Sequence, residues 1–235
     1  MPLLITFFII IAVFIAYLKT PKGKGMLGEF LIKMLIGKTK PSEKYIINNL
    51  MLKTENEKTS QIDHVVINPR GIFVIETKNY SGRIYGQENH QEWTQVLQYG
   101  KIKNKLYNPI KQNKTHIYHI SKVLSEKLPI TSAVVFVQAN VQHINASGVY
   151  TPLGLKRLLK QGERALSFKQ MELAYNELVA ANQISVSNRE HIKNIQTIQE
   201  EIKQNICPRC GKTLFRKKGK GTGLICLTPG CTEEK

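Results

Sequence analysis

Cysteine is absent from the first 206 residues of this 235-residue chain, and all four cysteines follow that point. A disulfide framework of the kind that holds small secreted folds together is therefore excluded for most of the sequence. Internal repeats and low-complexity segments are also absent, which excludes a repeat architecture. With 42% hydrophobic and 22% charged residues, the composition is that of a globular chain, long enough for one medium domain with small appendages.

Acidic residues are also scarce, because 17 Asp and Glu stand against 34 Lys and Arg. The formal net charge of +17 favours a polyanionic partner, either a nucleic acid or an anionic membrane surface. Charge alone does not decide between these two partners, and it says little about the fold.

The first 18 residues, MPLLITFFIIIAVFIAYL, contain no charged side chain. No Lys or Arg precedes this apolar run and no small-x-small site follows it, so the run lacks the features of a cleaved signal peptide. A helix over residues 2–18 would be about 25 Å long, at the short end for a membrane span. Lys19, Lys22 and Lys24 follow the run, which predicts a cytoplasmic location for the remainder. We expect a single-pass anchor in the cell membrane; a buried core helix is the alternative.

Apolar spacing and turn residues predict a mixed order of helices and strands along the rest of the chain. Helices are expected over residues 26–37, 108–124, 152–161, 169–181 and 187–204, after a basic linker at 19–25. Strands are expected over residues 45–52, 61–78 (a hairpin), 82–86 and 130–137, and residues 91–102 are ambiguous. This order predicts an α/β fold with one central mixed sheet flanked by helices.

The predicted hairpin has a carboxylate within each apolar arm. A turn centred between Pro69 and Arg70 would place Asp63 opposite Glu76, with their Cβ atoms about 5 Å apart. Lys78 lies two residues after Glu76 and shares its face. Like charges that oppose each other destabilise a sheet, so the arrangement requires a cation, and removal of either carboxylate should relieve repulsion in its absence.

A divalent metal would supply that cation, because paired carboxylates suit Mg²⁺ or Mn²⁺. Lys78 could then orient a water molecule or stabilise charge on a phosphate. The alternative is that Asp63 and Glu76 are exposed and Lys78 only pairs with one of them, as a register slip of one residue would allow.

Asp-x12-Glu-x-Lys on two adjacent strands, after a helix that carries a Glu, resembles the motif of the PD-(D/E)xK nuclease superfamily. The blocks GKGMLGE, QIDHVVINPRGIFVIETKNYSGRIYG and NPIKQN resemble the nuclease-related (NERD) domain over about residues 23–140. The resemblance implies a restriction-endonuclease-like sheet and Mg²⁺-dependent phosphodiester hydrolysis. It implies these active-site residues: Glu29, Asp63, Glu76 and Lys78, with Gln112 in support. Ile62 replaces the proline that precedes the aspartate in the superfamily.

Plainer interpretations exist for several of these residues. Glu29 and Lys33 have the spacing of an ion pair within one helix. His116 and His119 could share a helical face as metal ligands, although two helical histidines are more often structural. His64 is expected to point away from Asp63, as a core or supporting residue.

The cysteines form the pattern Cys-x2-Cys, a 15-residue spacer and Cys-x4-Cys. This spacing is typical of a structural zinc site, here with the ligands Cys207, Cys210, Cys226 and Cys231. The module resembles the zinc ribbon of bacterial type I DNA topoisomerases, and disulfides are the alternative. The spacer carries basic residues beside an aromatic ring, which suit a nucleic-acid backbone: Arg216, Lys217, Lys218 and Lys220.

The sequence therefore predicts four parts: a transmembrane anchor (2–18), a nuclease-like domain (19–140), a helical connector (141–205) and a zinc ribbon (206–235). The expected function is a membrane-anchored, metal-dependent nuclease acting on DNA. One alternative is a non-catalytic, membrane-tethered protein that binds nucleic acid, and another is a scaffold at the membrane surface.

Overall fold

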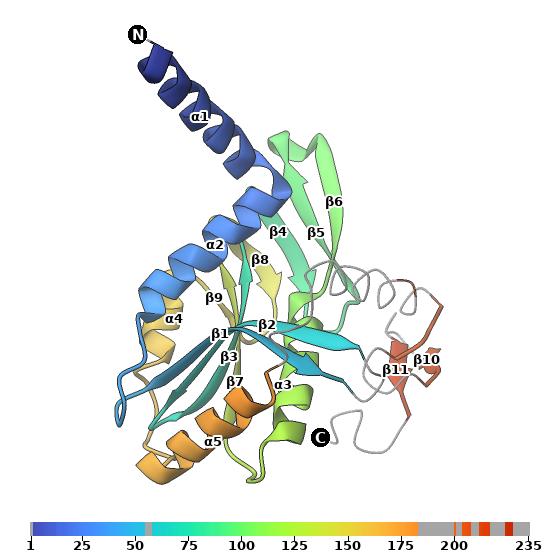
Figure 1. Ribbon diagram of the computed structural model, residues 1–235. Helices are drawn as coiled ribbons and strands as arrows, with labels where there is room; N and C mark the ends of the chain where they lie inside the picture. The colour runs from blue at the N-terminus through green and yellow to red at the C-terminus, as the bar shows by residue number, and fades with distance from the viewer. Residues whose placement is uncertain are drawn as a thin grey trace.

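The computed structural model describes residues 2–54, 58–182, 200, 204–207, 212–216 and 224–227 (Figure 1). A five-stranded sheet with the order β1-β2-β3-β7-β9 forms its centre. The strands are β1 (Tyr45–Lys53), β2 (Thr59–Asn68), β3 (Gly71–Lys78), β7 (Ile130–Phe136) and β9 (Val149–Tyr150). The first three strands are antiparallel, whereas β7 runs parallel to both β3 and β9. The central sheet is mixed, as the sequence predicts.

Helices cover both faces of this sheet (Figure 1). Helices α2 (Pro21–Ile36) and α4 (Pro152–Leu158) pack on one face, and α3 (Pro109–Val123) and α5 (Phe168–Ala180) pack on the other. The expected α/β architecture of a sheet flanked by helices is therefore confirmed.

Strand β3 is buried on both faces because it lies in the middle of the sheet. Ile72 and Val74 pack in the core beneath α3 and α5, whereas Phe73 and Ile75 pack in the core beneath α2 and α4. A near-continuous apolar run is the expected pattern for such a strand. The side chain that follows, Glu76, is consequently only 3% exposed.

A second sheet, with the order β6-β5-β4-β8, extends from the central one. Its strands are β4 (Arg83–Gln87), β5 (Glu92–Leu97), β6 (Ile102–Tyr107) and β8 (Asn140–Asn145), with the short helix η1 (Gln98–Gly100) between β5 and β6. Trp93 is fully buried, stacks on Phe136 of β7 and donates its indole N–H to the carbonyl of Gln87 at 2.9 Å. A Cβ on Gly86 would lie 2.3 Å from the Trp93 ring, so only glycine admits this packing.

Residues 19–25, which the sequence predicts as a linker, are largely helical, and this prediction is wrong. Helix α2 begins at Pro21 because Thr20 caps it, accepting the N–H of Gly23 at 3.1 Å. Gly23 also touches the last turn of the preceding helix, where a Cβ would lie 2.2 Å from the carbonyl oxygen of Tyr17. Capping and this close contact outweigh the low helix propensity of the glycines.

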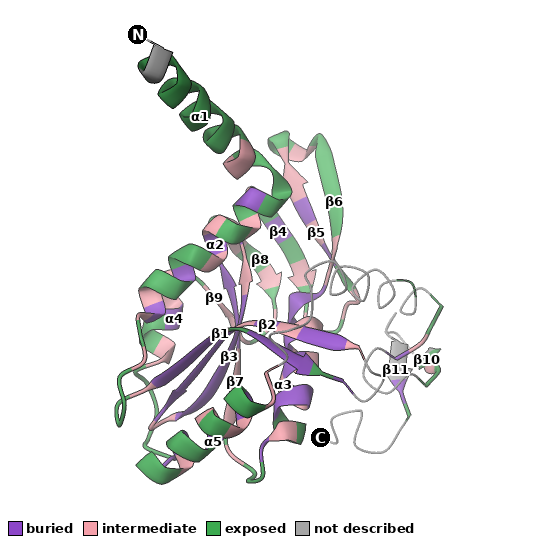
Figure 2. Cartoon of the chain, in the orientation of Figure 1, coloured by how far each residue is buried: buried purple, intermediate pink, exposed green. Residues whose placement is uncertain are grey.

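Helix α1 (Pro2–Lys19) projects from the body and exposes apolar side chains around most of its surface (Figures 1 and 2). No single helix in the described part of the chain is long and apolar enough to cross a membrane. The segments Leu4–Lys19 and Pro21–Ile36 meet that requirement only together, as a pair bent by 88°. The predicted transmembrane anchor at 2–18 is therefore not confirmed.

The segment 141–205, predicted as a helical connector, contributes strands and helices to the packed body in its described part. Strand β8 joins the second sheet, β9 joins the central sheet, and α4 and α5 cover opposite faces of the latter. The helix predicted at 187–204 lies outside the described residues, apart from residues 200 and 204.

The described C-terminal residues form an antiparallel pair, β10 (Leu214–Arg216) with β11 (Leu224–Cys226). Cys207 and Cys226 are buried, and they belong to one small cluster with Leu214. Several residues predicted to bind zinc or nucleic acid lie outside the described residues: Cys210, Cys231, Lys217, Lys218 and Lys220. Of Arg216 only the strand is described, and a zinc ribbon is not shown.

Helix α2 approaches the end of β3 closely at Gly28. A Cβ on Gly28 would lie 2.6 Å from the Cβ of Asn79, and the Asn79 side-chain amide donates to the carbonyl of Lys24 at 2.7 Å. By contrast, a Cβ on Gly25 would meet nothing within 4 Å. Gly28 and Gly25 of the same helix therefore tolerate an added methyl group very differently.

We predict that Gly28→Ala destabilises the protein, because the added methyl group forces α2 away from Asn79. Gly25→Ala is the matched control and should stabilise the fold by roughly 0.5–1 kcal/mol, the usual gain of alanine over glycine within a helix. Thermal unfolding of both variants measures the difference. Equal melting temperatures for the two would contradict the close contact at Gly28.

Candidate active site

The hairpin of β2 and β3 has the predicted register, with Asn68 opposite Gly71 and Ile67 opposite Ile72. The ladder ends at the pair of His64 and Ile75, one step before Asp63 and Glu76. In place of the next pair, the backbone N–H of Thr77 donates to Oδ2 of Asp63 at 2.7 Å. The Asp63 carboxylate therefore terminates the hairpin by binding the backbone of β3.

Asp63 also marks a break in the alternation of β2. Ile62 and Val65 are three residues apart, yet both pack in the core beneath α3 and α5. Strand β1 has a matching irregularity at Asn49, whose φ of 54° is left-handed, a conformation that asparagine tolerates better than most residues. The pairing of β1 with β2 passes over Asn49 and Asp63, so the ladder is interrupted on both sides of Asp63.

Glu76, Lys78 and Gln112 form a chain of contacts at the end of β3. Lys78 Nζ lies 2.6 Å from Oε1 of Glu76 and donates to Oε1 of Gln112 at 3.0 Å. The two β3 residues share a face because they are two positions apart. Gln112 reaches them from the first turn of α3, so the structure brings these three predicted residues together.

Helix α3 is held in place beside this chain of contacts by two asparagines. Asn108 caps the helix by accepting the N–H of Ile110 at 2.9 Å, and Pro109 occupies its first position, as the sequence predicts. The Asn113 amide donates to the carbonyl of Val74 at 2.8 Å and to Ser132 at 2.8 Å. These contacts fix α3 against β3 and β7, and therefore fix Gln112.

His116 and Ser60 were not predicted as part of the site, and both belong to it. His116 Nε2 lies 3.3 Å from Oε2 of Glu76, and its Nδ1 is hydrogen-bonded to the Ser60 hydroxyl at 2.8 Å. In the sequence, His116 was considered only together with His119. The more informative signal was that His116 follows Gln112 by four residues. Residues four apart lie on one helical face.

The two carboxylates have opposite electrostatic environments. Burial would raise the pKa of Glu76, but the charge of Lys78 and the contacts with His116 outweigh it and lower the pKa to about 2. Burial raises the pKa of Asp63 well above its usual value, and the charges of Glu76 and Glu29 add to the increase. Burial would lower the pKa of Lys78, but the charge of Glu76 reverses this and raises it.

Glu29 and His64 lie at the edge of this cluster. Burial and the charge of Glu76 raise the pKa of Glu29, and the charge of Lys78 lowers it. Glu29 is therefore close enough to interact electrostatically with the site, next to the contact at Gly28. His64 is buried, hydrogen-bonded to Asn48 at 2.7 Å, and burial is the main cause that lowers its pKa to about 4.

The residues present fit a magnesium ion with few protein ligands. Within the described residues, no group of three or more His, Cys, Asp and Glu side chains could hold a metal. Mg²⁺, however, keeps several water ligands and is commonly bound by one or two carboxylates together with substrate phosphates. Burial and the charges of Glu76 and Glu29 raise the pKa of Asp63 against the opposing effects of the Thr77 N–H and Lys78. Oε2 of Glu76 is buried without a hydrogen bond, 3.3 Å from Nε2 of His116. Asp63 and Glu76 could therefore supply the two carboxylates.

We predict that Asp63→Asn raises the melting temperature of the metal-free protein at neutral pH by a few degrees, since about 1 kcal/mol shifts it by 2–4 °C in a chain of this size. Asparagine keeps an oxygen for the Thr77 N–H and removes the unfavourable charge. The pKa of Asp63 is higher in the folded than in the unfolded protein. The wild type therefore loses stability as the pH rises from the unfolded-state pKa to the folded-state pKa. The gain should therefore vanish below about pH 4.

Glu76→Gln is the contrasting variant, and the structure corrects the expectation that removal of either carboxylate relieves repulsion. The lowered pKa of Glu76 stabilises the fold above pH ~4.3, and this stabilisation is lost as pH falls towards 2. Glu76→Gln should therefore lower the melting temperature at neutral pH and lose its effect in acid. Melting curves across pH measure both variants, and shifts of the same sign would refute the asymmetry.

Comparison with known proteins gives the chain a partial family assignment. It is 42% identical over 116 residues to an uncharacterized protein of Bacillus anthracis, a match that covers 49% of this chain and 54% of that relative. The chain thus spans about half the length of this curated relative. No solved structure matches it. The family model that matches, over residues 24–137, is the nuclease-related domain, NERD. Residues 24–137, which hold Glu29, Asp63, Glu76, Lys78 and Gln112, therefore carry a nuclease-related domain.

Proposed function

We propose that this chain is a membrane-anchored nuclease that hydrolyses phosphodiester bonds in DNA with the help of Mg²⁺ or Mn²⁺. The observation that carries the proposal is the cluster at the end of β3, where Glu76, Lys78 and Gln112 are in contact and Asp63 and Glu29 act on it electrostatically. This cluster lies within the nuclease-related domain.

Each residue has a role that its contacts suggest. Asp63 and Glu76 would hold the metal, which when bound polarises the scissile phosphate. Lys78, whose raised pKa keeps it protonated, would donate to the phosphate or to the attacking water. Gln112 holds the ammonium group of Lys78 in position. Glu29, with its raised pKa, would complete the site by contacting the water or the metal.

A second candidate function is non-catalytic binding of nucleic acid by a membrane-tethered protein. One observation favours it: the Lys78 ammonium group already pairs with Glu76, and His116 contacts the other carboxylate oxygen. In that case the buried ion pair would be structural, and the basic surface would supply the affinity.

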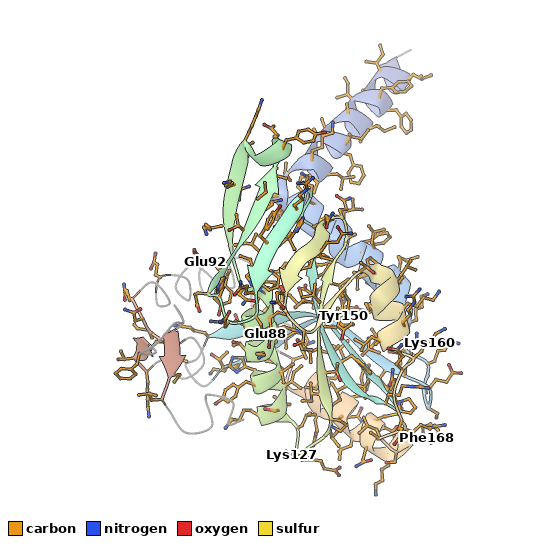
Figure 3. All side chains as sticks on the ribbon, turned by 180° about the vertical axis from the view of Figure 1, so that it is seen from behind. Glu88, Glu92, Lys127, Tyr150, Lys160 and Phe168 are labelled. Atoms are coloured by element: carbon orange, nitrogen blue, oxygen red, sulfur yellow. The ribbon has the colours of Figure 1, made fainter. Side chains whose placement is uncertain are left out.

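Catalysis separates these two functions. We predict that Lys78→Ala and Glu76→Gln each lower Mg²⁺-dependent cleavage of labelled DNA by several orders of magnitude. Their DNA affinity should change far less, because affinity comes mainly from Lys and Arg contacts to phosphates. Lys127→Ala, at an exposed lysine labelled in Figure 3, is the matched control and should cleave at the wild-type rate.

These measurements use the full-length chain in detergent, with melting curves to verify that each variant is folded. Mg²⁺ should also raise the melting temperature of the wild type but not of Glu76→Gln, because a ligand that binds the folded state stabilises it. Cleavage by folded Glu76→Gln at the wild-type rate would eliminate the proposed site. DNA binding by the wild type without cleavage under any divalent metal would favour the non-catalytic function.

The membrane anchor remains part of the proposal. Helix α1 exposes large apolar side chains, of which Ile10 is 66% exposed, and such a surface is costly in water. Lys19, Lys22 and Lys24 follow at its C-terminal end, which favours a cytoplasmic location for the domains beyond it.

A structural zinc ion in the C-terminal module is also proposed. Its support is that Cys207 and Cys226 lie buried in one cluster beside the β10–β11 pair. Cys210 and Cys231 would be the remaining ligands, and the basic residues of the spacer would contact nucleic acid. The module is too small to bury a core of its own, so metal binding would supply most of its folding free energy.

We predict that the purified chain contains one zinc ion and that Cys226→Ser releases it, because a thiolate ligand is lost. Leu227→Ser, at the exposed neighbouring position, is the matched control and should retain the metal. Elemental analysis by mass spectrometry gives the zinc content. Protein purified without chelator that holds no zinc would disprove the site.

A further inference from the structure

The outer face of the second sheet has a hollow that the proposed active site does not use. Its volume is about 530 Å³, and it is lined by residues of three adjacent strands: Tyr85, Thr94, Val96, Lys103 and Lys105. On the opposite face of β4 and β5, Ile84 and Trp93 are fully inaccessible to solvent. These two strands therefore have one face in the core and one face open to solvent.

The strand register arranges this open face in two rows. In the first row, His143, Tyr85, Thr94 and Lys105 lie side by side across four strands. The Tyr85 and His143 rings stack with their centroids 4.5 Å apart and an angle of 6° between their planes. In the second row, Arg83, Val96 and Lys103 lie side by side across three strands. The first row thus places the stacked rings near Lys105, and the second places the apolar Val96 between Arg83 and Lys103.

Charge on this face is almost entirely positive. The four strands contain a single acidic residue, Glu92, at the start of β5. Lys105 donates to the Thr94 hydroxyl at 3.3 Å, and the side chains of Arg83 and Lys103 are exposed. No described carboxylate pairs with Lys103. The face therefore complements a polyanion. Lys103 and Lys105 are two positions apart on β6, which corresponds to about 6.8 Å along the strand.

We infer that this face binds a single strand of nucleic acid, with a base stacked on Tyr85 and phosphates against Lys103 and Lys105. Stacked aromatic rings beside a basic groove are the usual means of binding single strands, because every base has a π-face. A duplex does not expose its base faces in this way. A lipid surface would require side chains that protrude, whereas these line a hollow. The inference rests on the proposed nuclease function for its substrate class, and it identifies a substrate-binding surface outside the cluster of Glu76 and Lys78.

Binding of fluorescently labelled oligothymidine to the full-length chain in detergent, without added Mg²⁺, tests this surface. Tyr85→Leu should weaken binding roughly tenfold, whereas Tyr85→Phe, which keeps the ring, should bind like the wild type. Lys103→Gln with Lys105→Gln should weaken binding and lower the slope of log K against log salt by about 1.4, since each phosphate contact on a single strand contributes about 0.7.

Lys156→Gln with Lys160→Gln is the matched control, because it removes the same charge from exposed positions on and after α4 and should leave the salt slope unchanged. Variants of the open face that bind no more weakly than this control would overturn the inference. Unchanged oligothymidine binding with lost binding to phosphatidylserine-doped micelles would also overturn it, and would assign the face to lipid.

Two outcomes separate the open face from the proposed active site. If the wild type binds oligothymidine through Tyr85, Lys103 and Lys105 but cleaves nothing, the surface stands and the nuclease proposal fails. If the wild type cleaves DNA and the variants of the open face match the Lys156 and Lys160 control in both affinity and KM, the nuclease stands and the surface fails.

Discussion

The buried ion pair between Glu76 and Lys78 is the interaction on which the candidate site depends. Glu76 follows the apolar run of β3 in the middle of the sheet, so its carboxylate is inevitably removed from water. An isolated buried carboxylate is costly, and the ammonium group 2.6 Å away is what keeps it ionised. Removing one partner would leave the other charge buried, and the contacts of Gln112 and His116 on α3 with this pair would change with it.

Asp63, unlike Glu76, is a carboxylate whose ionised form the site disfavours. It binds the backbone of Thr77, yet burial and the nearby charges of Glu76 and Glu29 raise its pKa. A group in this state is one that a cation would stabilise. The cluster therefore combines the Glu76–Lys78 pair, which contacts α3, with Asp63, whose ionised form a cation would stabilise.

The two sheets have different physical roles because they are buried differently. Strand β3 is covered on both faces and holds Glu76 in a buried position. The second sheet is attached through Trp93, which packs on β7, and it leaves its other face open. The candidate cluster and the open basic face therefore lie on differently buried parts of the fold.

The sequence by itself determined the features that depend on local period, capping and turns. These include the hairpin register, the cap of α3 at Asn108 and the helices on either face of the sheet, and motif resemblance added the candidate site. Tertiary structure alone decided that His116 and Ser60 belong to the site, because they reach it from separate elements. It also decided that residues 21–25 are helical, through the contact of Gly23 with Tyr17, and that short strands such as β9 form. Such features follow from packing between distant segments, and no local pattern contains that information.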